Sequence, residues 1–90
     1  MTAKVRNMFS PNGNQVANQF IIETPEGTYF QSYRSIIAFI DKKTGERTLD
    51  EYYWDYSRTT SKYRNQFLGE GVADTRSKIQ SGEYKLADLN

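Results

Sequence analysis

The first half of the chain alternates apolar and polar residues in the two-residue rhythm of β-strands. A short strand is predicted at about residues 4–9 and a longer one at 15–24. The turn at 10–14 between them contains Asn-Gly, which tolerates the positive φ of tight hairpins. In the longer strand, Ile21 lies on one face and three apolar side chains lie on the other: Val16, Phe20 and Ile22. We therefore expect a half-buried hairpin in this region.

Three further strands are predicted before residue 50, at residues 28–33, 35–41 and 46–49. The turn at 25–27 joins the first of these to the preceding hairpin. Residues 42–45 form the last turn, with Gly at a position suited to the left-handed conformation. Residues 35–41 are apolar on both faces, which favours a central strand, although a short helix fits the same periodicity.

In the second half of the chain the pattern becomes helical. Three hydroxyl side chains are candidates for the N-cap of a first helix: Ser57, Thr59 and Thr60. Gly69 is suited to its C-terminal end, so the helix has about ten residues. Tyr63 and Phe67, four residues apart, share its buried face. This leaves Lys62 and Arg58 pointing outward.

A second short helix is predicted at residues 75–81, capped by Asp74, ended by Gly82 and attached to the core through Ile79. Residues 83–86 alternate like an edge strand. Together these elements predict an α+β fold, a four- to five-stranded, mostly antiparallel sheet with two short helices packed on one side.

The length of 90 residues limits the chain to one hydrophobic core. We expect a single domain over residues 1–90, in which residues 1–14 form a peripheral strand and turn. The chain is rich in aromatic residues, with seven Tyr, five Phe and one Trp. Tyrosine hydroxyls can stay hydrated at a surface or an interface. An exposed edge strand also allows two copies to pair as a homodimer.

The sequence contains neither cysteine nor histidine. This excludes disulfides, thiolate metal sites, cysteine nucleophiles and catalytic triads built on His. Residues 1–10 lack the apolar run of a signal peptide, and no segment approaches the roughly twenty apolar residues of a membrane span. We therefore expect a cytoplasmic protein with no cofactor and no membrane contact.

Two acidic patterns resemble parts of metal sites, and neither is sufficient for one. Asp50, Glu51 and Asp55 lack the alternating ligands and the turn glycine of a calcium-binding loop, so pairing with neighbouring basic residues is the favoured role. Residues 83–85 have the Glu-x-Lys spacing of certain metal-dependent nucleases, but any short strand produces this spacing by chance. We expect no bound metal and no enzymatic activity.

Aromatic, hydroxyl and basic residues are interleaved in the segment that follows. The net charge of the chain is only +1, yet residues 56–69 carry three basic residues and no acidic one. Trp, Tyr and Arg are enriched at protein-binding hot spots, whereas cations, hydroxyls and aromatics also suit nucleic acid. Seven residues are the candidate partner contacts: Trp54, Tyr56, Arg58, Thr59, Lys62, Tyr63 and Arg64. The alternative is that the aromatics attach the helix to the sheet and the cations are solvated.

Several local strings resemble a family of small phage and prophage proteins of Gram-positive bacteria to which no function is assigned. The similarity extends over about residues 18–90. It rests on four strings: Tyr29-Phe30-Gln31-Ser32-Tyr33, Tyr53-Trp54-Asp55-Tyr56-Ser57-Arg58-Thr59-Thr60, Lys62-Tyr63-Arg64-Asn65-Gln66-Phe67-Leu68-Gly69 and Ser81-Gly82-Glu83-Tyr84. The phage context implies a small accessory protein that binds a host protein, as anti-CRISPR proteins do.

Two functions are therefore expected. The first is a phage-encoded binding protein that inhibits a host defence complex, such as a CRISPR effector or another protein–nucleic acid complex, by covering a functional surface. The alternative is a small phage accessory protein that binds nucleic acid. In that case the three cations would contact phosphates and make the binding strongly salt-dependent.

Overall fold

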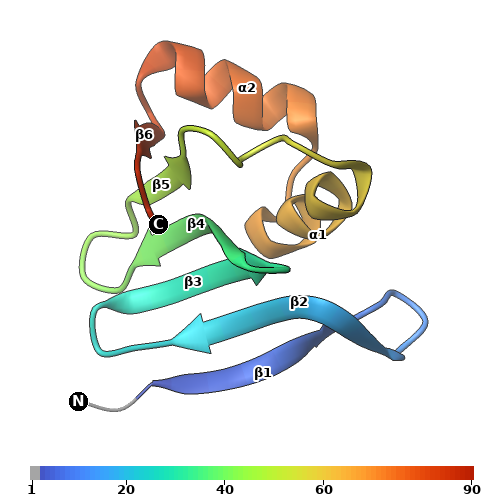
Figure 1. The fold of residues 1–90 in the computed structure, drawn as a ribbon. Coiled ribbons are helices and arrows are strands. Elements are labelled where there is room, and N and C mark those ends of the chain that lie inside the picture. Colours follow the sequence, from blue (N-terminus) through green and yellow to red (C-terminus); the bar gives the residue numbers. More distant parts are fainter. Residues whose placement is uncertain (1–2) are drawn as a thin grey trace.

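The computed structural model describes residues 3–90 as one sheet and two helices (Figure 1). Residues 1 and 2 of the expected single domain lie outside the described residues. The strands are β1 Lys4–Phe9, β2 Gln15–Glu23, β3 Gly27–Ser32, β4 Ser35–Asp41, β5 Arg47–Asp50 and β6 Lys85–Ala87. The helices are α1 Arg58–Leu68 and α2 Val72–Ser81, and both lie between β5 and β6 in the sequence.

The six strands follow chain order across the sheet. Neighbours from β1 to β5 pair antiparallel, whereas β6 pairs parallel with β5. A parallel pair needs a long crossover, which the two helices supply. The α+β class and the mostly antiparallel sheet are confirmed. The expected four to five strands are one or two too few, because β1 and β6 both join the same sheet as its two edges.

Most element boundaries agree with the predicted ones, including the strand rather than helix at β4. The prediction for α2 is wrong at its start, since the helix begins at Val72 and Gly71 is its N-cap. Thr75 N already donates to the Gly71 carbonyl at 3.1 Å, so Thr75 lies inside the first turn. Asp74 therefore lies in this turn as an acidic residue, where it complements the helix dipole, and does not act as the cap.

The predicted facing of β2 is correct for Phe20, Ile22 and Ile21 and wrong only for Val16. Ile21 is buried in the core, while Phe20 and Ile22 lie on the opposite, half-exposed face. Asn18 adopts φ +64, which interrupts the regular alternation of the strand. As a result Val16, five residues before Ile21, also packs against the core.

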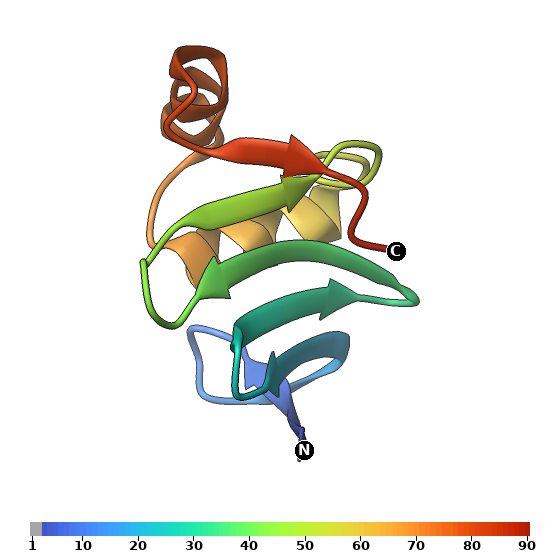
Figure 2. The same cartoon turned by 90° about the vertical axis from the view of Figure 1, so that its left-hand side faces the viewer.

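Helix α1 covers one face of the sheet, over β3 and β4. Ser57 Oγ accepts a hydrogen bond from Thr60 N at 3.1 Å, and Gly69 ends the helix with φ +73, as predicted. Phe67 of α1 stacks on Phe30 of β3 with 5.7 Å between the ring centroids. Helix α2, in contrast, lies along the β5–β6 edge of the sheet (Figures 1 and 2). Both helices were predicted to pack on one face of the sheet. This prediction is correct for α1 and wrong for α2.

The other face of the sheet is turned toward the viewer in Figure 2 and carries no helix among residues 3–90. None of the helices in this described part of the chain is long and apolar enough to cross a membrane.

Candidate functional site

Residues 51–57 form the loop from β5 to α1, and the buried Asp50 holds its first part. One carboxylate oxygen of Asp50 accepts hydrogen bonds from Tyr52 N at 3.1 Å and Tyr53 N at 2.9 Å. The other accepts from Leu89 N at 2.8 Å and from Asn90 Nδ2 at 3.0 Å. Four donors satisfy this fully buried carboxylate, so the loop and the last residues of the chain are fixed to the same point.

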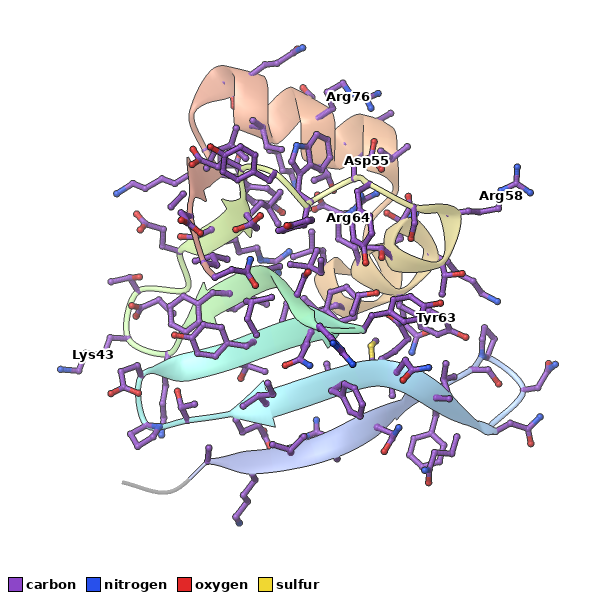
Figure 3. The ribbon with its side chains drawn as sticks, viewed as in Figure 1. Lys43, Asp55, Arg58, Tyr63, Arg64 and Arg76 are labelled. Atoms are coloured by element: carbon purple, nitrogen blue, oxygen red, sulfur yellow. The ribbon has the colours of Figure 1, made fainter. Side chains whose placement is uncertain are left out.

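The buried Arg64 holds the second part of the same loop. Its Nη1 donates to the Trp54 carbonyl at 2.6 Å and to Asp55 Oδ1 at 3.0 Å. Its Nη2 donates to Ser61 Oγ and Asn65 Oδ1, both at 2.9 Å. The side chain is 0% exposed, and Figure 3 shows it pointing toward Asp55 inside the molecule. Arg64 was expected to contact a partner, and this prediction is wrong because the guanidinium is used internally.

Two of the candidate aromatic residues also belong to the interior. Tyr63 is buried in the core cluster and Trp54 packs against that cluster at its margin. The Arg64 guanidinium lies 5.2 Å from the centroid of the Trp54 ring, and Arg76 lies 5.7 Å from it. The alternative that these aromatics attach the helix to the sheet is therefore correct for Tyr63 and largely correct for Trp54.

The remaining four candidates are exposed around the start of α1: Tyr56, Arg58, Thr59 and Lys62. Arg58 points into solvent in Figure 3. Within the described residues, neither Arg58 nor Lys62 takes part in an ion pair. A shallow depression beside them is lined by Asp55, Tyr56, Ser57, Arg58, Ser61, Lys62 and Asn65. The positive charge of this region is thus available to a partner.

Two exposed tyrosines, which were not among the seven candidate contacts, extend this region. Tyr52 is 73% exposed and Tyr53 is 38% exposed. The rings of Tyr53 and Tyr56 meet edge to face with centroids 5.4 Å apart, and those of Tyr52 and Tyr53 do so at 6.5 Å. A run of Tyr immediately after a buried strand was the only sequence signal for them.

The β3–β4 turn adds a fourth exposed tyrosine, Tyr33, on the same side of the molecule. Ser32 Oγ and Thr60 Oγ1 are 2.8 Å apart, which places this turn beside the first turn of α1. In Figure 2 the turn and the loop of residues 51–57 both lie at the right, on either side of the C-terminus. We define the tyrosine surface by six residues: Tyr33, Tyr52, Tyr53, Tyr56, Arg58 and Lys62.

The backbone at Tyr33 is strained. Its φ is +55, a left-handed conformation that is unfavourable for a bulky side chain. Tyr33 N donates to the carbonyl of Asn18 at 2.7 Å, and Gln31 Nε2 donates to the carbonyl of Tyr33 at 2.7 Å. These two bonds hold an aromatic side chain outward at a position where Gly would be easier to accommodate.

A second polar cluster, also missed from the sequence, surrounds Glu70 between α1 and α2. Its carboxylate accepts hydrogen bonds from Thr75 Oγ1, Tyr84 OH and Lys78 Nζ at 2.6, 2.7 and 2.8 Å. Arg47 Nη1 lies 3.9 Å away and also donates to Tyr84 OH at 3.1 Å. With all its oxygens engaged, Glu70 acts as the anchor of α2.

These contacts determine the protonation of the cluster. Burial alone would raise the pKa of Glu70, but the hydrogen bonds from Lys78, Thr75 and Tyr84 together lower it below the usual 4.5. The hydrogen bond to Glu70 raises the pKa of Lys78 above 10.5. Burial, followed by the hydrogen bond to Glu70, raises the pKa of Tyr84 above 10.0. The cluster is therefore locked in one charge state around neutral pH.

Of the three acidic residues 50, 51 and 55, Asp50 and Asp55 make side-chain contacts, whereas Glu51 is exposed. Asp55 pairs with Arg64 at 3.0 Å and with Arg76 at 3.2 Å, so the predicted pairing with the basic segment is confirmed for Asp55. It is wrong for Asp50, whose carboxylate accepts from backbone N–H groups and from Asn90, and among the described residues Glu51 has no ion pair. In the part of the chain that the structure describes, no three acidic side chains converge as a metal site would require.

Residues 3–84 match DUF8033, which is described as a family of unknown function. The chain belongs to the DUF8033 family. The matched region contains every residue of the tyrosine surface and all elements up to the end of α2. No curated protein and no solved structure matches the chain. The chemistry of the DUF8033 chain must therefore be inferred from its own surface.

Proposed function

We propose that this DUF8033 protein is a binding protein without catalytic activity that inhibits a host defence complex by covering one of its functional surfaces. The observation that carries the proposal is the cluster of exposed tyrosines beside Arg58 and Lys62. Tyrosine combines a large apolar contact area with a polar group, and Tyr and Arg are enriched at binding hot spots.

The rigidity of the loop supports a binding role for it. A flexible loop would lose conformational entropy when it orders against a partner, and this loss weakens binding. Here Asp50 holds Tyr52 N and Tyr53 N, and Arg64 holds the Trp54 carbonyl. The backbone that carries Tyr52 and Tyr53 is thus already ordered in the free chain.

The charge of the tyrosine surface indicates the chemistry of the partner. Arg58 and Lys62 are exposed and positive, so the partner surface that meets the start of α1 carries carboxylates or phosphates, while the exposed Glu51 lies beside Tyr52 at the other end of the loop. The resemblance to phage proteins supports a host defence complex, such as a CRISPR effector, as the partner that carries it.

Capture from a host lysate, with and without nuclease, tests this proposal. The tagged wild-type chain is compared with Arg58→Glu/Lys62→Glu and with the control Lys42→Glu/Lys43→Glu. The control makes the same charge change, and Lys43 projects on the opposite side of the molecule from Arg58 (Figure 3). We expect the wild type and the control to recover a stoichiometric, nuclease-resistant host protein that the Arg58/Lys62 variant loses. Equal recovery by all three proteins would remove the tyrosine surface from the proposal.

Binding to nucleic acid is the second candidate, and the exposed cations and tyrosines favour it. Tyrosines can stack on bases, while Arg58 and Lys62 can contact phosphates. Because Arg64 is buried, this segment offers two phosphate contacts and not three, which predicts a salt slope of about −1.8 on duplex DNA. In the capture experiment, this function predicts that nucleic acid and its usual binders are recovered only without nuclease.

A further inference from the structure

Strand β1 is an outer strand of the sheet and pairs only with β2 among the described elements. Outer strands present unpaired backbone N–H and C=O groups, which another strand can satisfy. The opposite edge, β6, is only three residues long, whereas β1 has six residues and contains no proline. The edge at β1 is therefore the more accessible of the two.

Two of the most exposed large apolar residues lie on this edge strand. Val5 is 62% exposed and Phe9 is 53% exposed. Both lie on the side opposite the buried Met8, because side chains alternate along a strand. Val5 also begins an apolar row on the uncovered face, since it lies opposite Ile22 of β2, which lies opposite Tyr29 of β3.

The charges on β1 do not protect the edge by themselves. Lys4 and Arg6 are the charged residues of the strand, and Arg6 is neutralised by Glu23 of β2 at 2.6 Å. The register shift between β1 and β2 arises from extra residues in β2 and not in β1. Asn7 and Phe9 are two residues apart, whereas their partners Phe20 and Gln15 are five apart, so β1 itself runs without an inserted residue.

We propose that β1 pairs antiparallel with β1 of a second copy, with Asn7 on the two-fold axis. In this register, Val5 lies opposite Phe9 of the second copy and Arg6 lies opposite its Met8. The two sheets then continue into one, and the apolar row of each uncovered face extends across the interface. The free backbone N–H and C=O groups of each edge then bond to those of the other. Val5 of one copy and Phe9 of the other become cross-strand neighbours.

The charge pattern of β1 selects this register over its neighbours. A two-fold axis perpendicular to the sheet keeps each side chain on its own face. Residues opposite one another must therefore lie on the same face, and because side chains alternate along the strand, they are separated by an even number of positions. The axis then passes through a residue and not between two residues. An axis at Arg6 would place that side chain opposite itself, and an axis at Val5 would place Lys4 opposite Arg6. Like charges directly opposite one another are destabilising. An axis at Met8 would leave Val5 opposite no residue of β1.

The absence of cysteine from the sequence allows a direct test by disulfide formation. Opposite residues of antiparallel strands have Cα atoms about 4.5–5.5 Å apart, which is within the range of a disulfide. Asn7→Cys is expected to form a disulfide-linked dimer on mild oxidation, whereas the exposed control Lys43→Cys does not. The product is measured on a non-reducing denaturing gel.

A second set of variants fixes the register and does not depend on Asn7. Val5→Cys alone is not expected to cross-link, because its copies would lie about 14 Å apart along the strands. A mixture of Val5→Cys and Phe9→Cys chains is expected to give the mixed disulfide. Val5→Lys, in which each dimer carries two altered contacts, is expected to raise the dimer dissociation constant at least about tenfold by sedimentation equilibrium.

Three results would overturn the proposal. One is a wild-type chain that sediments as a monomer at every concentration up to about 1 mM. Another is Asn7→Cys cross-linking no faster than Lys43→Cys. The third is a mixed disulfide from Val5→Cys and Phe9→Cys that is no more abundant than the product of Val5→Cys alone.

Discussion

Two buried charged residues, Asp50 and Arg64, decide how the tyrosine surface is built. Each accepts or donates four hydrogen bonds, and the loop of residues 51–57 lies between them. A buried charge is costly unless it is paired and hydrogen-bonded, so the loop conformation and the two charges depend on each other, although Arg64 Nε is buried without a partner. The backbone of Tyr52, Tyr53 and Trp54 is thus held by two buried residues.

Arg64→Lys tests the internal role of this arginine. Lysine keeps the charge but lacks the planar fork that reaches Trp54, Asp55 and two side chains of α1 at once. We expect the free energy of unfolding, measured in urea, to fall by about 2 kcal/mol. The exposed control Arg58→Lys should change it by less than about 0.5 kcal/mol. Equal stability of the two variants would show that Arg64 is not needed to hold the loop.

Tyr33→Gly tests whether the Tyr33 side chain stabilises the fold or only strains the backbone of the β3–β4 turn. A left-handed conformation costs a non-glycine residue roughly 1–2 kcal/mol, which Gly avoids, although Gly loses more entropy on folding. We expect the free energy of unfolding to stay unchanged or rise by up to about 1 kcal/mol. The adjacent Arg34→Gly, where φ is not positive, should lower it. A Tyr33→Gly variant less stable than Arg34→Gly would mean that the Tyr33 side chain serves the fold.

At the scale of elements, α2 depends on one carboxylate. Glu70 follows α1, yet its bonds go to Thr75 and Lys78 of α2 and to Tyr84 before β6. It therefore joins the crossover helices to the edge of the sheet. Because α2 makes little contact with the sheet face, this cluster supplies much of its specific attachment.

The pH dependence of unfolding tests this attachment. The pKa of Glu70 is lowered in the folded chain, so its contribution is present above pH 4.5 and is lost as the pH falls through the folded value. The raised pKa values of Lys78 and Tyr84 mean that their contributions are lost at alkaline pH, above about 10. We expect Glu70→Gln to be less stable than the wild type at pH 7 and to lose less stability between pH 7 and 3. The exposed control Glu83→Gln should follow the wild-type curve.

The sequence was a sufficient guide to elements whose signals are local. The strands of the first half, the Ser57 cap and the Gly69 end of α1 all follow from alternation and capping chemistry. The side on which Val16 lies could not be predicted in this way, because it depends on the conformation of Asn18, whose carbonyl accepts from the distant Tyr33.

Contacts between distant residues also explain why the burial of Arg64 and the exposure of Tyr52 and Tyr53 were not predicted. Helical periodicity places Tyr63 inward and Lys62 outward, as observed, but Arg64 is buried because the preceding loop folds back over it. The exposure of Tyr52 and Tyr53 likewise depends on Asp50, whose partners include the distant Asn90. Contacts between residues far apart in the chain decided these positions, and periodicity carries no information about them.

At the scale of the whole molecule, the two proposed interfaces lie apart. Strand β1 forms the lower edge of the sheet in Figure 2, whereas the loop of residues 51–57 lies at the upper right. A dimer through β1 would leave both tyrosine surfaces accessible. Such a dimer would bind a partner with repeated sites more tightly than the monomer, because the second contact is intramolecular.

The central claim is that the tyrosine surface contacts a partner, and hydroxyl-radical footprinting tests it most directly. The oxidation of each tyrosine is measured by mass spectrometry in the free chain and in the captured complex. We predict that Tyr33, Tyr52, Tyr53 and Tyr56 become protected in the complex, while Tyr29 on the uncovered face of the sheet does not. Unchanged oxidation of the four tyrosines, with protection appearing elsewhere on the chain, would contradict the account.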